Sequence, residues 1–318
     1  TWDAAEGAFS AAGSDTAQEA LAVAASTPGV GLSRFREIHE HKPGYEDWHV
    51  RRVSLQEAIE AGRISAEWAA ARLRQWGANS AVYITRVLGE FAEQDESGII
   101  PIEWIYRAVE RWKALEDAGE LVELAPTCLG TDVGDGGDPS IIARWSGRVL
   151  LALEAVAQRS AGETMQVAGR VKALVDAHGC GVALDTIGVG AGVGSRLKEL
   201  SVRYLPFVAS AASARKDRSG EIKFMNLRAE GWWGMREALD PEFGDDLALP
   251  DDPDLIGELA APQYEHTSNG RLKVESKDAV KLRIGRSTDK ADAAIMGRWA
   301  QSRVSAGAAR LRTAWDTR

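Results

Sequence analysis

The sequence lacks several features that mark particular classes of protein. It has two cysteines in 318 residues, Cys128 and Cys180, which lie far apart and form no CxxC pair. A disulfide-stapled secreted domain is therefore excluded, and a reducing compartment is expected. No apolar run approaches the roughly 20 residues of a membrane helix, and no charged and then apolar leader opens the chain. We expect a cytoplasmic protein without a membrane partner.

The chain also lacks a positive net charge. It has 38 basic and 47 acidic residues, which give a net charge of −9. This balance argues against a protein that coats nucleic acid wholesale. It allows an enzyme that touches DNA locally, because a metal site needs clustered carboxylates and these lower the sum. The length predicts two domains, and a hydrophobic fraction of 45% can fill their cores.

Motifs for nucleotide binding and for nucleophilic catalysis are missing as well. No Gly-Lys pair occurs, so there is no Walker A loop, and the run 188–194 fails the GxGxxG pattern in every register. We predict that this run is a flexible turn between a strand and a helix. No nucleophile elbow is present, and the five histidines have no metal spacing.

Residues 1–95 are predicted to be mostly helical. The apolar run 20–25 ends at Pro28 and Gly29 and is typical of a buried strand, and 48–53 alternates like a second strand. Helices are expected over 2–10 and 33–40, after the capping residues Ser54 and Ser65, and through 87–91. The acidic segment 93–98 is the candidate linker.

The pattern changes after residue 124. Strands are predicted at 129–133, 140–145 and 149–155, then a helix at 164–177, a strand at 182–187, a helix at 195–200 and a strand at 202–208. This order predicts a mixed α/β sheet flanked by helices, not a doubly wound fold. Beyond it, Asn226 caps a helix, Asn269 and Gly270 predict a hairpin, and a last helix runs from about Thr288 past Trp299.

Three acidic positions lie where elements of this sheet end or begin. Asp132 ends the first strand, Asp185 ends the fourth, and Asp292 lies in the first turn of the last helix, three residues after Asp289. Open α/β sheets place their sites at such strand ends, and carboxylate clusters suit Mg²⁺ or Mn²⁺. A single aspartate at a strand end is more often a turn former or a cap, and Asp138 is a turn residue by the same logic.

Basic residues precede the third acidic position. A run of like charge is usually a solvated face, but its place beside Asp292 favours contact with DNA phosphates. The residues of this predicted DNA-binding run are Arg271, Lys273, Lys277, Lys281, Arg283, Arg286 and Lys290.

Taken together, these motifs resemble the large subunit of tailed-phage terminases, the motor and nuclease that packages viral DNA. Residues 25–29 resemble the family's coupling motif, with Ser26, Thr27 and Pro28, and 86–91 resembles the end of its ATPase domain. Residues 129–138, 184–192 and 287–293 resemble the three acidic motifs of its nuclease, and 226–233 resembles a segment common in these nucleases.

The resemblance implies an RNase H-like nuclease domain at 124–300. It further implies that Asp132, Asp185 and Asp292 hold two Mg²⁺ or Mn²⁺ ions, with Asp138 and Asp289 as auxiliary ligands. The implied reaction is endonucleolytic cleavage of concatemeric double-stranded viral DNA, in the host cytoplasm.

It also implies that residues 1–95 are the later part of a P-loop ATPase domain, followed by a linker helix at 96–123, and that 301–318 is a basic tail. The Walker A and Walker B motifs are absent, so ATP is expected to act only together with a missing N-terminal half. The implied partners are double-stranded DNA, the terminase small subunit and the portal protein, and a homo-oligomeric ring when the protein is full length.

Two other functions remain open from the residues. One is another RNase H-like nuclease, such as a junction resolvase or a transposase-type recombinase, against which the coupling motif argues. The other is a catalytically silent packaging or portal-docking module, in which the carboxylates are turn formers.

Overall fold

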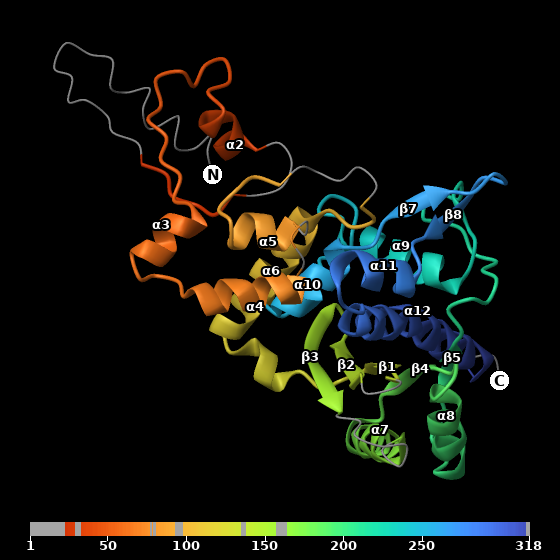
Figure 1. Cartoon of the computed structure of the whole chain (residues 1–318). Helices are drawn as coiled ribbons and strands as arrows, with labels where there is room; N and C mark the ends of the chain where they lie inside the picture. The colour runs from red at the N-terminus through yellow and green to blue at the C-terminus, as the bar shows by residue number, and fades with distance from the viewer. Residues whose placement is uncertain are drawn as a thin grey trace.

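The computed structural model describes residues 23–28, 33–76, 78, 81–92, 98–134, 138–156 and 164–315. A five-stranded sheet forms the centre (Figure 1). The long helix α12 (Asp289–Trp315) covers one face, while α7 (Thr164–His178) and α8 (Gly190–Glu199) lie on the other. The structure therefore has the mixed α/β sheet flanked by helices that the strand order predicts.

The sheet follows the predicted elements closely. Its strands are β1 (Cys128–Asp132), β2 (Ser140–Ser146), β3 (Val149–Val156), β4 (Gly181–Asp185) and β5 (Leu205–Phe207). They lie side by side in the order β3-β2-β1-β4-β5. Strand β2 is antiparallel to β1 and β3, while β4 is parallel to β1 and to β5. The carboxyl ends of β1 and β4 therefore meet at the same edge.

Alternation along the strands sends neighbouring side chains to opposite faces. Leu129 and Val182 belong to the apolar cluster that α7 and α8 cover. Cys128 and Ala183, one position away from them, belong to the cluster on the side of α12. By the same period of two, Asp132 and Asp185 at the strand ends lie on the α12 side.

Helix α12 packs on the sheet with the two backbones in direct contact. A Cβ atom on Gly130 of β1 would lie 2.0 Å from the carbonyl oxygen of Ala293, and one on Gly297 would lie 2.5 Å from the ring of Trp145. The indole of Trp145 donates a hydrogen bond of 2.9 Å to the carbonyl of Ala294. Glycine at positions 130 and 297 thus fixes the height of α12 above β1.

Further helices extend the core on the α12 side. They are α4 (Ala66–Trp76), α5 (Ala81–Arg86), α6 (Ile102–Asp117), α9 (Leu227–Leu239) and α10 (Pro253–Ala260), and each contributes buried side chains to the cluster shared with α12. Helix α6 begins after Pro101 and packs Ile105 and Ala108 into this cluster with no exposed surface. The predicted linker helix is therefore part of one continuous core.

A small sheet lies beside α9. The predicted hairpin is present as β7 (Tyr264–His266) and β8 (Arg271–Val274), antiparallel and joined by a turn in which Gly270 has φ +72°. Strand β6 (Lys223–Phe224) pairs with β8 in parallel. Helix α11 (Lys277–Ile284) follows β8 and leads to α12.

Several N-terminal predictions hold. Helix α2 (Arg34–His39) begins after Ser33, α3 (Leu55–Glu60) begins with the full capping box of Ser54 and Glu57, and α4 follows Ser65. The predicted helix at 2–10 lies outside the described residues, as do residues 20–22 of the predicted first strand.

Other predictions in this region were wrong. Val23 is 84% exposed and the described residues 23–28 form no strand, nor do residues 48–53. A strand needs a hydrogen-bonded neighbour, and none of the described strands pairs with either segment. The predicted helix through 87–91 is shorter than expected. It is present as α5, which ends at Arg86, so that 87–91 lies outside it.

The glycine-rich run 188–194 was also predicted incorrectly in part. Only its first two residues form the turn, since α8 begins at Gly190 and includes the rest. In the part of the chain that is described, no helix is long and apolar enough to cross a membrane.

Candidate functional site

Two aspartates end neighbouring parallel strands. Thr131 of β1 is in register with Leu184 of β4. The next residues, Asp132 and Asp185, therefore lie side by side at the ends of the two adjacent strands. Paired residues of parallel strands share a face and lie roughly 5 Å apart in the hydrogen-bonding direction. Asp132 is 4% exposed, while Asp185 is half-buried and accepts a hydrogen bond of 2.9 Å from the backbone of Ile187.

The first turn of α12 brings two more carboxylates to this edge. The close contact of α12 with β1 directs its N-terminus toward the strand ends, and Asp289 and Asp292 share one face of that turn. The ammonium of Lys277, the first residue of α11, lies 2.9 Å from Asp132, 2.9 Å from Asp289 and 3.6 Å from Asp292. Three of the predicted site residues therefore converge on one cation.

The carboxylate of Asp292 is fixed from the other side by α9. The guanidinium of Arg228 lies 2.8 Å from one oxygen of Asp292, and the indole of Trp232 donates a hydrogen bond of 3.1 Å to the same oxygen. The hydroxyl of Thr288 donates one of 2.7 Å to the other oxygen. Arg228 also donates to the carbonyl of Glu275 and stacks on the ring of Trp232, so its own position is fixed.

These surroundings give the carboxyl groups different proton affinities. Burial raises the pKa of Asp132 to about 7, with Lys277 opposing the rise and Asp292 adding to it. Burial also raises the pKa of Asp185. Burial acts in the same direction on Asp292, but Arg228 and Lys277 together hold the pKa of that group below its ordinary value. Burial opposes the charge of Lys277, yet Asp132 and the two α12 carboxylates raise its pKa.

Asp138 lies at the rim of the site. Its carboxylate is 3.2 Å from the ammonium of Lys281 on α11, one turn beyond Lys277, and both side chains are about half exposed. No contact joins Asp138 to the other aspartates among the described residues. The structure thus brings Asp132, Asp289 and Asp292 into one cluster with Asp185 beside it, and leaves Asp138 at its edge.

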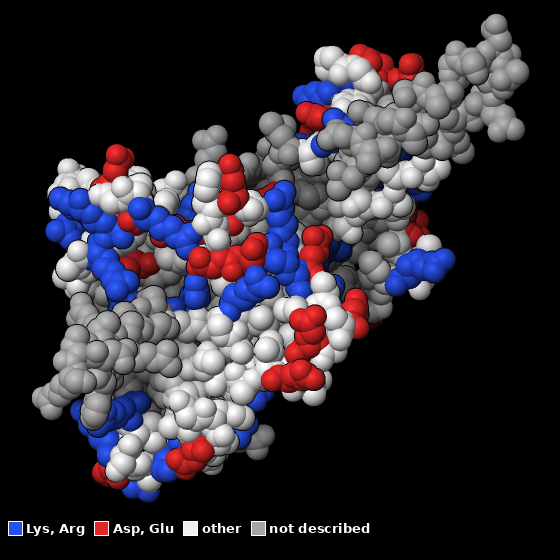
Figure 2. Space-filling view, turned by 180° about the vertical axis from the view of Figure 1, so that it is seen from behind, with Lys and Arg blue, Asp and Glu red and all other residues white. Residues whose placement is uncertain are grey.

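The predicted basic run does not form one continuous strip. Lys277 and Lys281 face the carboxylates, whereas Arg286 pairs with Asp254 and Glu258, and Lys290 pairs with Asp252 and Asp254. The remaining members have partners nearby: Arg271 with the carbonyl of Phe224, Lys273 with Glu265, and Arg283 with Glu275. Figure 2 shows basic and acidic side chains interleaved on one face of the molecule.

Sequence reasoning missed three residues that hold the site in place. Arg228 and Trp232 lie in the segment 226–233, where the sequence favours core packing or an interface over stacking on bases for the two tryptophans and gives Arg228 no role. Glu258 of α10 is 1% exposed, accepts a hydrogen bond from the backbone of Ala291 and pairs with Arg286, and so anchors the start of α12. Two tryptophans and two arginines on α9 were the available signal. No feature of the sequence distinguishes Glu258.

The predicted coupling residues lie far from this cluster. Ser26 and Thr27 are exposed, and the hydroxyl of Ser26 donates to the carbonyl of Thr27. With Pro28 they line a cavity of ≈ 750 Å³ that is also bordered by α2 and residues 48–55. Figure 1 shows α2 and α3 at the opposite end of the molecule from α12.

The ligand type of the carboxylate cluster fits a hard divalent cation, whereas the spacing of its carboxylates in this structure does not. Asp132, Asp185, Asp289 and Asp292 offer only oxygen ligands, which Mg²⁺ and Mn²⁺ prefer, and three of them already surround a positive charge. Within the described ranges, no three His, Cys, Asp or Glu side chains are close enough together to bind one metal ion. In this arrangement the positive charge between the carboxylates is that of Lys277.

Comparisons with known proteins give structural neighbours only. No protein-family model matches the chain, and no curated protein matches it. The chain is structurally similar to the nuclease domain of the large terminase subunit of bacterial virus Sf6, at 21% identity and a TM-score of 0.48, over 63% of this chain and 97% of that one.

Two further similar structures are the large terminase nuclease of the thermophilic phage G20c with bound magnesium and the large terminase nuclease domain of Thermus phage P74-26. The first has 19% identity and a TM-score of 0.39, over 54% of this chain and 79% of that one. The second has 18% identity and a TM-score of 0.38, over 54% and 76%.

Proposed function

We propose that this chain is the nuclease part of a tailed-phage large terminase subunit, a metal-dependent endonuclease that cuts double-stranded DNA. The observation that carries the proposal is the convergence of Asp132, Asp289 and Asp292 on Lys277, with Asp185 beside Asp132 on the next strand. These aspartates come from two strands and a helix that are distant in sequence. Aspartates that served only as turn formers would have no reason to lie together. Their meeting therefore supports a common site.

Each residue has a role in this proposal. Asp132, Asp185 and Asp292 would hold two Mg²⁺ or Mn²⁺ ions, with Asp289 and Asp138 as auxiliary ligands. Such ions, when bound, activate a water and stabilise the leaving oxygen of a phosphodiester. Arg228, Trp232 and Thr288 orient the Asp292 carboxylate, and burial between the sheet and α12 excludes water from Asp132.

The proposal extends to the rest of the chain. Residues 1–95 would be the later part of the packaging ATPase domain, 96–123 its linker to the nuclease at 124–300, and 301–318 a basic tail. Ser26, Thr27 and Pro28 would couple ATP hydrolysis to DNA movement. The partners would be double-stranded DNA, a small terminase subunit and a portal protein.

Replacing single metal ligands tests the nuclease assignment. We expect Asp132→Asn and Asp185→Asn each to abolish Mn²⁺-dependent cutting of supercoiled plasmid, because an amide cannot supply the charge of a carboxylate to a divalent ion. The matched control is Asp176→Asn on α7, an exposed aspartate that pairs with Lys172 on the other face of the sheet. Thermal unfolding checks that all variants are folded. Cutting at the wild-type rate by both site variants would refute the assignment.

A further inference from the structure

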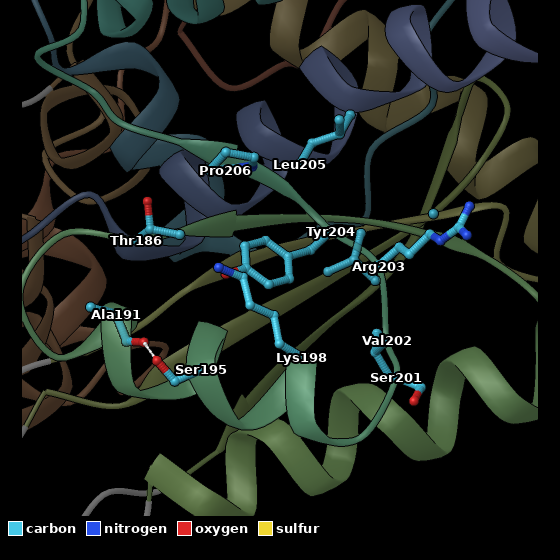
Figure 3. Close-up of a pocket in the computed structure, with 12 residues that line it drawn as sticks. Thr186, Ala191, Ser195, Lys198, Ser201, Val202, Arg203, Tyr204, Leu205 and Pro206 are labelled. Atoms are coloured by element: carbon cyan, nitrogen blue, oxygen red, sulfur yellow. Dashed lines mark hydrogen bonds between the residues drawn. The ribbon is translucent and has the colours of Figure 1, made fainter.

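A groove of ≈ 1110 Å³ runs between α8 and the edge strand β5 (Figure 3). Ala191, Ser195 and Lys198 line its α8 side, at a spacing that places them on one face of that helix. Tyr204 and Pro206 line the β5 side. The groove therefore follows the whole length of α8.

The aromatic floor of the groove is in direct contact with α8. A Cβ atom on Gly194 would lie 2.6 Å from the hydroxyl oxygen of Tyr204, so the ring packs where that helix has no side chain. The ammonium of Lys198 lies 5.9 Å from the centre of the same ring. In Figure 3 the Lys198 side chain runs beside the ring, and its nitrogen points to the side of the groove on which Thr186 lies. The Lys198 ammonium thus lies within cation–π range of Tyr204.

The groove is positively charged and rich in hydroxyl groups. Lys198 and Arg203 line it, together with four hydroxyl-bearing residues (Thr186, Ser195, Ser201 and Tyr204) and no carboxylate. Among the described residues, no salt bridge joins Lys198 or Arg203 to an acidic group. By contrast, Arg196 on another face of the same helix is neutralised by Glu199 at 2.7 Å. The two groove cations therefore remain available to an anion.

One end of the groove lies at the same end of β4 as Asp185. Thr186, which lines it, directly follows Asp185 at the end of β4. Helix α8 has 10 residues and is therefore about 15 Å long.

We infer that this groove binds the sugar–phosphate backbone of the DNA that leads away from the carboxylate site. Lys198 and Arg203 contact phosphates, and the hydroxyl groups of Thr186 and Ser201 donate hydrogen bonds to the same backbone, while that of Ser195 already donates to the carbonyl of Ala191. The inference rests on the proposed nuclease function and adds to it a path for the substrate. It also supplies DNA contacts that the basic run 271–290 lacks, since Arg286 and Lys290 are paired with carboxylates there.

The test compares two double variants with the same loss of charge. Lys198→Gln combined with Arg203→Gln removes the groove cations, and Lys172→Gln combined with Arg196→Gln removes two cations that pair with acids on their own helices. Binding of a fluorescent DNA duplex is measured in EDTA, where no cutting occurs, at several salt concentrations. Equal thermal midpoints establish that both proteins are folded.

We expect the slope of log K against log salt to fall by about 2 for the groove variant, since each lost phosphate contact removes about 0.9. The control variant should keep the wild-type slope. If the groove variant keeps the wild-type slope and the wild-type protein cuts DNA, the groove does not bind DNA, and the proposed nuclease function is unaffected. Failure of the wild type to bind and cut DNA would overturn both. A reduced slope together with wild-type cutting by both Asp132→Asn and Asp185→Asn would support the groove as a DNA contact and overturn the assignment of the carboxylate site.

Discussion

The two ends of the described chain are stabilised in different ways. Around the sheet, α12 touches β1 backbone to backbone and shares one core with α6, α9 and α10. At the other end, α2 buries only Ile38 and α3 buries none of its side chains. Two of the ion pairs there are exposed, between Arg51 and Glu57 and between Arg52 and Glu90.

This contrast separates non-local from local stabilisation. The carboxylate cluster exists only because α11 and α12 dock on strands far away in sequence, with Lys277 meeting Asp132 across 145 residues. The helix α3 depends on a capping box made within four residues, Ser54 to Glu57. A substitution at the sheet should therefore disturb the whole domain, while one at α3 should remain local.

The largest effect is expected from the contact between α12 and β1. Gly130→Ala places a methyl group against backbone atoms that no rotamer change can move, so we expect a loss of more than about 3 kcal/mol of unfolding free energy and of cutting activity. Gly169→Ala on α7 is the control, since nothing lies near its Cβ position and alanine favours a helix. Urea unfolding measures the unfolding free energy of both variants. A Gly130→Ala protein as stable as the wild type would contradict the contact.

A somewhat smaller loss is expected at the pair of Arg228 and Asp292, whose side chains are 11% and 13% exposed. Arg228→Ala leaves a nearly buried carboxylate without its main partner, which should cost about 2–3 kcal/mol and reduce cutting. Arg196→Ala, which breaks an exposed pair on α8, should cost well under 1 kcal/mol. Equal losses in the two variants would show that Asp292 does not depend on α9.

A conditional effect is expected at Lys277. Lys277→Ala removes the cation among three carboxylates, so the protein should lose about 1–2 kcal/mol in EDTA because their repulsion is no longer compensated. Mn²⁺ should raise the thermal midpoint of this variant more than that of the wild type. Lys281→Ala, which breaks only the exposed pair with Asp138, is the control. The same Mn²⁺ response in all three proteins would speak against a metal site at this cluster.

The smallest effect is expected at α3. Ser54→Ala removes the capping box and should cost about 1 kcal/mol, seen as faster hydrogen exchange in residues 55–60 with cutting unchanged. Ser54→Thr keeps the hydroxyl and should behave as the wild type. If Ser54→Ala also accelerates exchange in β1, the two ends of the chain are coupled and the contrast fails.

The same contrast explains what could be predicted from the sequence. All five strands of the sheet were located, because apolar alternation and turn residues bound each of them. Asp132 and Asp185 could be placed at strand ends, and Asp289 and Asp292 in one helical turn, from local pattern alone. The segments 23–28 and 48–53 look like strands by the same criteria, yet they have no strand to pair with.

What could not be predicted is which residues meet across the fold. Lys277 was grouped with six other basic residues as a DNA contact, since its distance from Asp132 depends on how α11 docks. Arg286 and Lys290 look equally free in the sequence, but α10 supplies them with carboxylates. Glu258 is an ordinary helical residue until the fold buries it beside Ala291.

The docking of α12 has a consequence for the order of events during synthesis. Trp145 of β2 bonds to Ala294 of α12 across 149 residues, so closing this contact has a high entropic cost and comes late. The strands carrying Asp132 and Asp185 leave the ribosome long before the helix carrying Asp289 and Asp292. A growing chain therefore has no assembled carboxylate cluster until the segment around Gly297 has emerged, and the proposed cutting activity should appear only at that point.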